Sequence, residues 1–475
     1  MPQIKKTKIV ATLGPASSSE EVIEKMIHAG VNVFRINFSH ADHEDVRERI
    51  RIIRSLSEKH NIYISILADL QGPKLRVGEM EEGAEVAPGD TVEFITTKPF
   101  KGNAKKAYMT YQRFPVDVSP GEKILLDDGK LIFEVVSSDK KEKVITKVIQ
   151  GGPFKSKKGV NLPNTNISLP ALTDKDIVDA KFAIQEKVDW IALSFVRNSD
   201  DLIGLKELID KHSDHKIPII SKIEKPEALE NIDKIIAYSD GLMVARGDLG
   251  VEVPAAEVPL IQKQLVNRAK KARIPVIIAT QMMETMIDSL TATRAEVNDV
   301  ANSVMDGADA VMLSGETSVG KYPVQVIETM TSILKSVENS PLIEVPQTPP
   351  SIRTKRFMTK SICYHAAHMA NEIDAAAICT LTNSGYTAFQ ISAWRPKAHV
   401  LVFSSNKTIL SQLNLLWGVK AFYYDRFEST DKTVEQVNSI AQKNGWVKPG
   451  EMLINLAAMP IIEKGMVNTL RISQV

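Results

Sequence analysis

The stretch at residues 218–247, PIISKIEKPEALENIDKIIAYSDGLMVARG, contains two nearly continuous apolar runs separated by an amphipathic segment. The first run is PIISKIE at 218–224 and the second is GLMVARG at 241–247. Apolar runs of this kind are typical of strands that are buried on both faces of a parallel sheet. The stretch therefore predicts a strand, a helical connection and a second parallel strand.

The same alternation recurs along the chain on both sides of this stretch. The other six runs lie at residues 8–14, 31–38, 63–70, 190–196, 275–281 and 310–315. Eight successive strand–helix units favour a closed (β/α)8 TIM barrel over the alternative of a doubly wound open sheet. In the first connection, Ser17 with Glu20 predicts a capping box at the start of a helix, and Gly30 predicts its end.

One connection has a different sequence pattern, in which short stretches of alternating apolar and polar residues are separated by turn-forming residues. Between Leu70 and Ile167 the signals are PGD at 88–90, PGE at 120–122 and DGK at 128–130. We expect residues 71–166 to form a small β-barrel domain inserted after the third strand. An insertion there rises from the catalytic face and can act as a lid. The alternative is an insertion with no part in catalysis; KKG at 157–159, near its exit, favours the lid.

The barrel is therefore expected at residues 1–70 and 167–340, and a further domain follows it. Residues 339–350 are rich in proline and predict a linker. Residues 351–475 predict a C-terminal α/β domain, because strand-like runs alternate there with helical segments. Those runs lie at 375–382, 399–404, 419–424, 451–455 and 468–472.

The composition excludes several classes of protein. Lys and Arg number 59 against 58 for Asp and Glu, so the 475-residue chain has no charge excess that would attract nucleic acid or anionic lipid. Cys363 and Cys379 are the only cysteines, which excludes a disulfide framework. The sequence has neither a signal peptide nor an apolar stretch of the roughly 20 residues that a membrane helix needs. We therefore expect a cytoplasmic protein.

Polar residues gather where the predicted strands stop. Barrel enzymes build their active sites from such strand ends, so this pattern predicts a catalytic cluster rather than a chance arrangement. The residues are Arg35, Asn37, Ser39, His40, Asp69, Lys74, Arg76, Lys222, Glu224, Arg246, Asp248, Thr280, Gln281, Ser314 and Glu316.

Lys222 and Glu224 alternate along one strand and so project to the same side. Alone they are equally consistent with an ordinary ion pair. Asp248, from the next strand, adds a second carboxylate, and two carboxylates with open positions suit Mg²⁺. Lys222 then becomes a fixed positive charge for a transferring phosphoryl group, which Arg35 can also clamp. The pattern predicts Mg²⁺-dependent phosphoryl transfer.

A nucleotide-binding P-loop is excluded although one segment resembles it. Residues 315–321 match G-x-x-x-x-G-K, but Tyr322 follows where the motif needs Ser or Thr to hold Mg²⁺. Barrel side chains and strand-end amides must therefore hold the phosphates.

Long ordered motifs over essentially the whole chain resemble the pyruvate kinase family. They are KTKIVATLGPAS at 6–17, FRINFSH at 34–40, KKGVNLP at 157–163, SKIEKPEALENIDKII at 221–236, VARGDLGVEVP at 244–254, IATQMMETM at 278–286, TRAEVNDVANSVMDGADAVMLSGET at 293–317 and GKYP at 320–323. The resemblance implies phosphoryl transfer from phosphoenolpyruvate to ADP, giving pyruvate and ATP in the last step of glycolysis. It also implies a Mg²⁺ (or Mn²⁺) cofactor and a homotetramer.

The resemblance implies a role for each substrate-side residue. Lys222 would stabilise the transferring phosphoryl group and the enolate, and Arg35 would grip the phosphoryl group. Glu224 and Asp248 would bind Mg²⁺. The amides of Gly247 and Asp248 would hold the substrate carboxylate, and Thr280 would lie near the carbon that is protonated.

Other roles implied by the resemblance concern the nucleotide and the proton. Ser314 and Glu316 are candidates for a proton relay. The residues expected around the nucleotide are Asn37, Ser39, His40, Arg76 and Lys158, the last two brought in by lid closure.

The family also commonly uses K⁺, and here the sequence departs from its pattern. The implied K⁺ ligands are Asn37, Ser39, Asp69 and the backbone oxygen of Leu70. Lys74 stands where Glu is usual, and its ammonium can supply the charge of a monovalent cation. We therefore predict that K⁺ is dispensable. In the alternative, Lys74 points to solvent and K⁺ still binds.

The C-terminal domain resembles the regulatory domain of the family. TNSGYT at 382–387 lies between a predicted strand and a helix, where amides can hold a phosphate of a sugar-phosphate effector. A simple capped turn explains the segment equally well, and the loop at 455–460 lacks the glycines of many effector-binding members.

Two other functions compete with this one. A metal-dependent lyase or aldolase acting on a pyruvate enolate could use Lys222, Glu224 and Asp248, but it needs neither Arg35 nor a lid. A catalytically inactive metabolite sensor would be expected to lose one of the catalytic residues, and none is lost.

Overall fold

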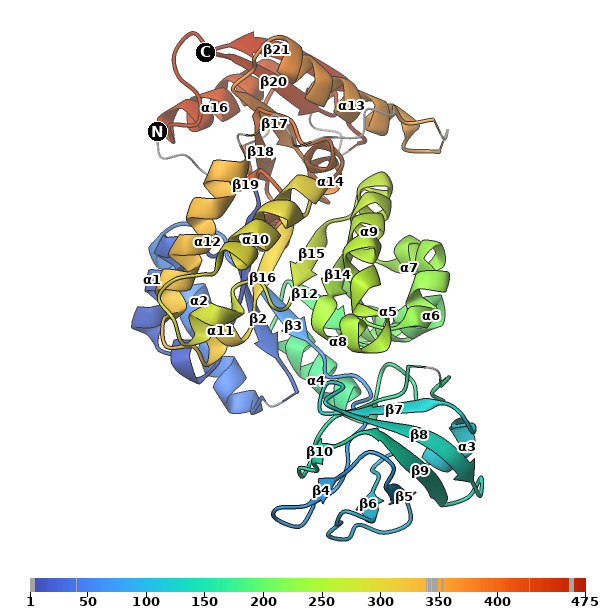
Figure 1. The fold of residues 1–475 in the computed structure, drawn as a ribbon. Helices are drawn as coiled ribbons and strands as arrows, with labels where there is room; N and C mark the ends of the chain where they lie inside the picture. The colour runs from blue at the N-terminus through green and yellow to red at the C-terminus, as the bar shows by residue number, and fades with distance from the viewer. Residues whose placement is uncertain are drawn as a thin grey trace.

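The computed structural model describes residues 5–39, 41–163, 165–338, 340, 343, 349–351, 354–426, 428–460 and 465–475. His40, predicted to contact the nucleotide, and most of the predicted linker lie outside these residues. Figure 1 shows three parts in a row, with a barrel between a C-terminal α/β unit and a β-rich unit.

Eight parallel strands close into a barrel, which confirms the predicted (β/α)8 fold. Their order around the barrel is β1-β16-β15-β14-β13-β12-β3-β2, and β1 also pairs with β2, so no edge is left open. The strands are β1 (Lys8–Thr12), β2 (Val33–Asn37), β3 (Ser65–Asp69), β12 (Trp190–Leu193), β13 (Ile219–Ile223), β14 (Gly241–Ala245), β15 (Val276–Ala279) and β16 (Ala310–Leu313).

The barrel strands are buried on both faces, as their apolar runs predicted. Alternate residues such as Val10, Ile220 and Met243 fill the barrel interior. Their neighbours Ile9 and Leu242 pack outward against the surrounding helices. Those helices are α1 (Glu20–Ala29), α2 (His43–Lys59), α4 (Asp174–Gln185), α5 (Ser199–His212), α6 (Pro226–Glu230), α7 (Ile232–Tyr238), α8 (Arg246–Glu252), α9 (Val258–Ala272), α10 (Arg294–Asp306), α11 (Gly315–Ser318) and α12 (Pro323–Glu338).

The predicted capping box of Ser17 and Glu20 is wrong. The N-cap of α1 is Ser19, whose extended backbone lets its side chain accept from the Val22 amide. Ser17 is buried in a preceding 3-10 turn, and its hydroxyl accepts from the Gly14 amide instead. The predicted helix end is confirmed, because Gly30 has φ of 126° and its amide bonds back to Met26 and Ile27.

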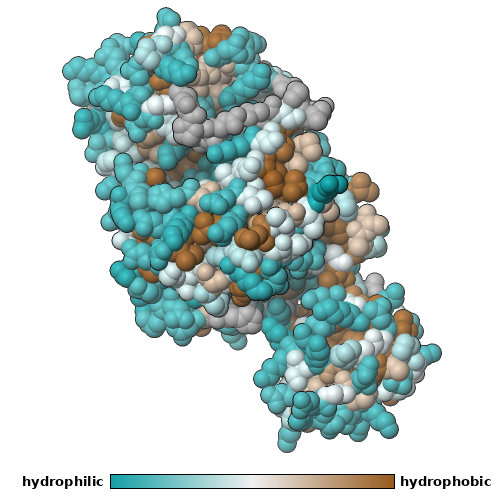
Figure 2. Space-filling view, turned by 60° about the vertical axis from the view of Figure 1, so that its left-hand side comes forward, coloured by the Kyte–Doolittle hydropathy of each residue, from teal (hydrophilic) through white to brown (hydrophobic). Residues whose placement is uncertain are grey.

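The β-rich unit follows β3 and returns to the barrel before α4. A six-stranded sheet of order β11-β7-β8-β9-β5-β6 curls around a core that includes Phe94, Phe133 and Phe154, and β10 pairs with β4. In Figure 2 it stands out from the barrel as a separate lobe. Its elements are β4 (Glu85–Val86), β5 (Thr91–Ile95), β6 (Lys106–Tyr108), α3 (Phe114–Asp117), β7 (Lys123–Leu126), β8 (Leu131–Ser138), β9 (Lys143–Gln150), β10 (Gly152–Pro153) and β11 (Val160–Asn161).

The C-terminal unit is an α/β sheet of order β19-β18-β17-β20-β21, in which only β21 runs antiparallel to its neighbour. Its elements are α13 (Phe357–Glu372), β17 (Ala377–Leu381), α14 (Tyr386–Ala393), β18 (His399–Ser404), α15 (Lys407–Gln412), β19 (Val419–Tyr423), α16 (Thr430–Lys443), β20 (Met452–Ala457) and β21 (Thr469–Gln474). Within the described ranges, no helix has the length and apolar character that a membrane crossing requires.

The C-terminal unit closes one end of the barrel. Leu415 joins the apolar cluster inside the barrel, and the Trp190 indole donates to the Gln412 carbonyl at 3.0 Å. A buried ion pair joins Arg395 to Asp309 just before β16, with 2.8 Å between Nη1 and Oδ1. These contacts lie at the amino ends of the strands, so the carboxyl ends remain open toward the β-rich unit.

Candidate active site

Four charged side chains from β2, β3 and the end of β13 meet at the carboxyl ends of the barrel, although β12 lies between β3 and β13. Asp69 lies between two cations, with 2.6 Å from its Oδ2 to Arg35 Nε and 3.3 Å from its Oδ1 to Lys222 Nζ. Lys222 Nζ also lies 2.9 Å from Glu224 Oε1, and it donates to the Ser194 hydroxyl at 2.7 Å. The predicted same-side placement of Lys222 and Glu224 is thus present. Asp69 and Ser194 complete the ring around the ammonium.

This cluster is largely removed from water, which sets its protonation. The side chains of Lys222 and Glu224 are 11% and 1% exposed. Burial lowers the pKa of Lys222, but the carboxylates of Asp69 and Glu224 outweigh it and raise this pKa above its ordinary value. Burial, helped by Asp248, raises the pKa of Glu224 to about 6 against the opposing effect of Lys222. Lys222 is therefore a permanently charged group at neutral pH.

The residues present fit a divalent cation. Glu224 Oε2 accepts from the Phe195 amide at 2.7 Å, but Glu224 Oε1 is buried and accepts no hydrogen bond. Among the described residues, the Lys222 ammonium, 2.9 Å away, is the only cation beside this oxygen, so the oxygen keeps room for a second cation as a ligand. Asp248 lies in the first turn of α8. It lines a cleft between the barrel and the β-rich unit, together with Phe195, whose amide binds Glu224. Two carboxylates from adjoining elements are a suitable ligand set for Mg²⁺.

Thr280 is held in a strained backbone conformation directly after β15. Its φ is 69°, and Gln281 follows with φ of 53°, in a region that β-branched residues rarely adopt. The Thr280 hydroxyl accepts from the Gly247 amide at 2.7 Å. The Thr280 carbonyl accepts from Arg246 Nη2 at 2.7 Å, and Asp299 of α10 pairs with Arg246 at 2.6 Å. Two contacts with α8 therefore hold Thr280 in position, and Asp299 of α10 in turn holds Arg246.

Glu316 uses both carboxylate oxygens to hold backbone amides. One oxygen accepts from Ser314 at 2.7 Å and the other from Met283 at 3.1 Å. Glu316 is buried, so these bonds tie the end of β16 to the segment after Thr280. This arrangement places Ser314 and Glu316 at the strand end that the sequence predicted for them.

A cleft of about 640 Å³ separates the barrel mouth from the β-rich unit. Lys74, which is exposed, lines it together with Asp248. A polar bridge crosses the boundary, where Asn161 of β11 donates to Glu252 of α8 at 2.9 Å. Glu252 in turn pairs with the buried Lys225 at 2.7 Å. The barrel and the β-rich unit thus meet through a buried carboxylate.

The predicted nucleotide residues fall into two groups. Asn37 ends β2 and accepts from the Ser39 amide at 3.1 Å. Arg76 and Lys158 lie in the β-rich unit, where Arg76 donates to the Lys157 carbonyl at 2.8 Å and Lys158 pairs with Asp127 at 2.9 Å. Among the described residues, no hydrogen bond or ion pair links the second group to the first.

Known proteins resemble this chain over its whole length. A family model described as "Pyruvate kinase, barrel domain" matches residues 4–327, and one described as "Pyruvate kinase, alpha/beta domain" matches residues 360–473. The chain belongs to the pyruvate kinase family. It is 42% identical to a pyruvate kinase of Geobacillus stearothermophilus over 470 residues, which cover 98% of this chain and 80% of the relative. It is also 42% identical to one from Corynebacterium glutamicum, covering 96% and 94%.

A solved structure agrees with the sequence matches. The pyruvate kinase from Cryptosporidium parvum superposes with a TM-score of 0.92 at 31% identity, covering 99% of this chain and 96% of that one. The chain is accordingly a phosphotransferase that passes the phosphoryl group of phosphoenolpyruvate to ADP. The family match decides against a lyase or aldolase on the same barrel.

Sequence reasoning missed several supporting residues of the pyruvate kinase site. Ser194, Asp299 and Glu252 were given no role, although they hold Lys222, Arg246 and Lys225. Ser194 was detectable as a polar residue inside an apolar run. No pattern in the sequence connects Asp299 with Arg246, because 53 residues separate them.

Proposed function

We propose that Lys222 and Arg35 provide the positive charge for phosphoryl transfer from phosphoenolpyruvate to ADP, with Mg²⁺ (or Mn²⁺) held by Glu224 and Asp248. The observation that carries this proposal is Lys222, kept charged between two buried carboxylates at the open end of the barrel. A preorganised cation in a site shielded from water stabilises charge that develops on the transferring group. The bound metal would supply further charge neutralisation at the phosphoryl and enolate oxygens.

The substrate carboxylate would bind at the start of α8, at the amides of Gly247 and Asp248. Because the Gly247 amide donates to the Thr280 hydroxyl, a bound carboxylate would compete with that hydroxyl for the amide. Release of the hydroxyl would leave Thr280 free to interact with the substrate near the carbon that is protonated. The strained backbone of Thr280, held by Arg246, supports a positioning function for this segment. In the same proposal, Ser314 and Glu316 relay the proton.

The nucleotide would lie between β2 and the β-rich unit, which would act as a lid. Asn37, Ser39 and His40 would approach it from the barrel, and Arg76 and Lys158 from the lid. Arg76 and Lys158 already lie on adjacent segments of the lid, at an isolated bridge between Arg76 and Gly159. Closing of the cleft would bring these cations to the phosphates.

Lys74 would replace K⁺. Two observations support this: Lys74 lines the cleft with Asp248, and two of the implied K⁺ ligands have other partners. The Leu70 carbonyl accepts from the Ser194 hydroxyl at 2.7 Å, and Asp69 is paired with Arg35 and Lys222. An ammonium in the cleft carries the same charge as the monovalent ion.

The test is pyruvate formation from phosphoenolpyruvate, ADP and Mg²⁺ in buffer free of K⁺ and NH₄⁺. Activity that K⁺ raises less than about twofold is expected, and Lys74→Glu should make the enzyme depend on K⁺. Lys155→Glu, an exposed lid lysine outside the cleft, is the matched control and should leave the activity independent of K⁺. Activity of the unaltered chain only with K⁺ contradicts the role of Lys74. If no pyruvate forms either with or without K⁺, the alternative of a catalytically inactive metabolite sensor is favoured.

We further propose a cytoplasmic homotetramer with barrel residues 1–70 and 167–340, lid residues 71–166 and regulatory residues 351–475. A sugar-phosphate effector would bind at residues 382–387, where the Gly385 amide donates to the Thr382 hydroxyl at 3.0 Å. A phosphate would have to displace this hydroxyl. Light scattering tests the tetramer, and activation by sugar phosphates that Thr382→Val abolishes tests the effector site.

A further inference from the structure

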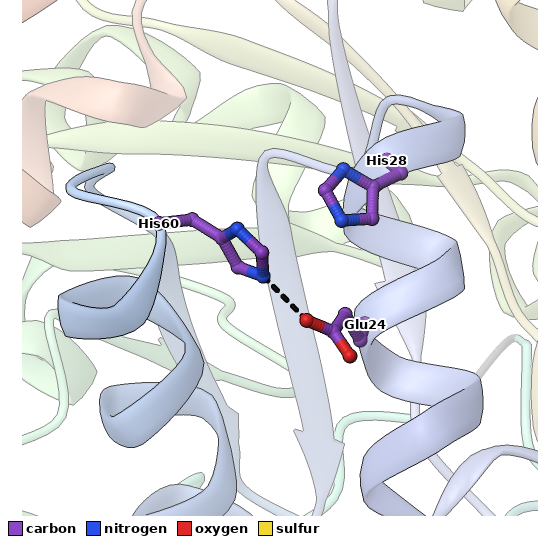
Figure 3. Close-up of side chains that lie close together, drawn as sticks. All are labelled: Glu24, His28 and His60. Atoms are coloured by element: carbon purple, nitrogen blue, oxygen red, sulfur yellow. Dashed lines mark hydrogen bonds and ion pairs between the residues drawn. The ribbon is translucent and has the colours of Figure 1, made fainter.

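Glu24, His28 and His60 form a cluster on the outer wall of the barrel (Figure 3). One ligand atom from each of the three lies within 4.8 Å of the others. His60 Nε2 lies 2.5 Å from Glu24 Oε1, and the two imidazole rings meet edge to face with 4.8 Å between centroids. Figure 3 shows Glu24 and His28 projecting from α1 toward His60 at the end of α2.

The fold brings these side chains together for local reasons. Glu24 and His28 are four residues apart on α1, so they lie on one helical face, one turn apart. His60 is the C-cap residue of α2, and its amide bonds back to Leu56 and Glu58. Both helices are anchored to the barrel by apolar side chains, which include Ile23, Met26 and Leu56. The three groups are therefore presented by rigid elements rather than by a loop.

An ordinary ion-pair network explains only part of this cluster. Glu24 Oε1 accepts from both His60 and Lys59, the latter at 2.7 Å. His28 makes no hydrogen bond or ion pair with any described residue, and Glu24 Oε2 accepts no hydrogen bond from them. An imidazole and a carboxylate oxygen are thus left free beside a second imidazole. Surface ion pairs contribute little, so the Lys59 contact can be exchanged at low cost.

We propose that Glu24, His28 and His60 bind a divalent transition-metal ion such as Zn²⁺, with water completing the coordination. Two imidazoles and one carboxylate suit Zn²⁺ and its neighbours in the first transition row, whereas Mg²⁺ prefers oxygen ligands. Metal–ligand distances of about 2.0–2.2 Å require ligand atoms roughly 3.5 Å apart, so the cluster must contract by about 1 Å. His28 is exposed and can supply this movement by side-chain rotation.

The ion would act as a clamp between α1 and α2, separate from the reaction. The helices of a (β/α)8 barrel run opposite to its strands, so the carboxyl ends of α1 and α2 lie away from the catalytic mouth. The ion would stabilise the folded chain by binding it and not the unfolded chain. Its loss should change thermal stability and leave phosphoryl transfer unchanged.

The test is titration of the full chain with Zn²⁺ and with Co²⁺ while saturating Mg²⁺ occupies the catalytic carboxylates. One ion per chain should bind at micromolar concentration, give the visible Co²⁺ absorption of a four- or five-coordinate site with nitrogen ligands, and raise the melting temperature. His28→Ala should weaken binding at least tenfold and remove both signals. Because His28 has no described hydrogen-bond partner, this variant should fold and keep its basal activity.

A matched variant separates the site from general binding by surface histidines. His212 is exposed and lies in the last turn of α5, as His28 does in α1. His212→Ala should bind Zn²⁺ as the unaltered chain does, and Glu24→Gln should behave like His28→Ala. The proposal is overturned if no ion binds in the presence of Mg²⁺, or if His28→Ala and Glu24→Gln bind it unchanged.

Discussion

Buried or half-buried lysines lie at both ends of the barrel, and their surroundings shift their pKa values in opposite directions. At the mouth, Lys222 lies against two carboxylates, which raise its pKa. At the closed end, Lys5, Lys6 and Lys8 line a cavity of about 1090 Å³ between the barrel and the C-terminal unit. Burial lowers the pKa of Lys5 to about 7 and that of Lys6 to about 8, and Lys8 is lowered as well.

Lys8 and Lys222 are similarly buried, so the difference between them lies in the acceptors. Lys8 donates to the Val419 carbonyl at 2.8 Å, and Lys6 donates to the Pro396 carbonyl at 3.1 Å. The nearby carboxylate of Glu338 accepts from the backbone amides of Lys6 and Thr7 instead. A carbonyl satisfies the hydrogen bond of an ammonium without neutralising its charge. A buried lysine that must stay charged at neutral pH therefore needs carboxylates beside it.

The largest effect should come from removing the paired lysine. Lys222→Met takes away the cation at the mouth and leaves Asp69 and Glu224 with one partner fewer, so kcat should fall about 1000-fold. Lys8→Met removes a lysine of similar burial at the closed end and should keep kcat within about twofold. Steady-state assays of both variants make the comparison. A Lys222→Met enzyme within tenfold of the unaltered one would show that the ammonium is not essential.

A smaller loss should follow from breaking the ion pair that supports Thr280. Asp299→Asn removes the counter-charge of Arg246, whose guanidinium holds the Thr280 carbonyl. We expect kcat to fall about tenfold, with a lesser change in KM for phosphoenolpyruvate, because a displaced hydroxyl affects the reaction more than binding. Asp306→Asn, at the far end of α10 and paired with Lys263, is the control. Equal losses in the two variants would point to general destabilisation.

Glu252→Gln would replace the carboxylate that pairs with Lys225 at the mouth by a neutral amide. Lys225 would then have neutral acceptors, as Lys6 and Lys8 have at the closed end. Lys225 would lose its only carboxylate partner within 4 Å among the described residues, and stability should fall by about 1–3 kcal/mol. Because Glu252 also accepts from Asn161 of the lid, KM for ADP should rise a few-fold. Thermal melting and ADP kinetics measure these effects.

Asn161→Ala should raise KM for ADP as Glu252→Gln does, without the full loss of stability. An unchanged KM for ADP in both variants would exclude a role of the Asn161–Glu252 hydrogen bond in ADP binding.

The smallest effect is a dependence of stability on pH at the closed end. The pKa of Lys5 is about 7 in the folded chain, against 10.5 for the free group. Between these values the unfolded chain binds the proton and the folded chain does not, so Lys5 favours folding increasingly as the pH rises. Lys5→Met should therefore be more stable than the unaltered chain at pH 7, by about 1 kcal/mol.

That advantage should shrink as the pH approaches 10, as followed by thermal melting. Lys25→Met, an exposed position on α1 paired with Glu21, should show no such trend over this range. A Lys5→Met advantage that is constant from pH 7 to 10 would contradict the lowered pKa.

Much of the fold follows from local patterns in the sequence. Each barrel strand is an apolar run that is buried on both faces, and the predicted turns of the lid carry Gly89, Gly121 and Gly129, each with φ between 81° and 95°. The predicted cap at Ser17 failed because three consecutive serines, at 17–19, precede the helix, and only backbone geometry decides which one comes directly before the first helical turn. Local patterns locate elements well and their ends less well.

The sequence by itself determined the barrel, the inserted β-rich unit, the family and the strand ends that carry Arg35, Lys222, Glu224 and Thr280. These features depend on burial and on order along the chain, which the sequence displays directly. Only the tertiary structure decided which charges meet: Asp69 between Arg35 and Lys222, Asp299 on Arg246, and His60 beside Glu24. Electrostatic interactions depend on distances of a few ångströms between residues far apart in the chain, and folding alone sets those distances.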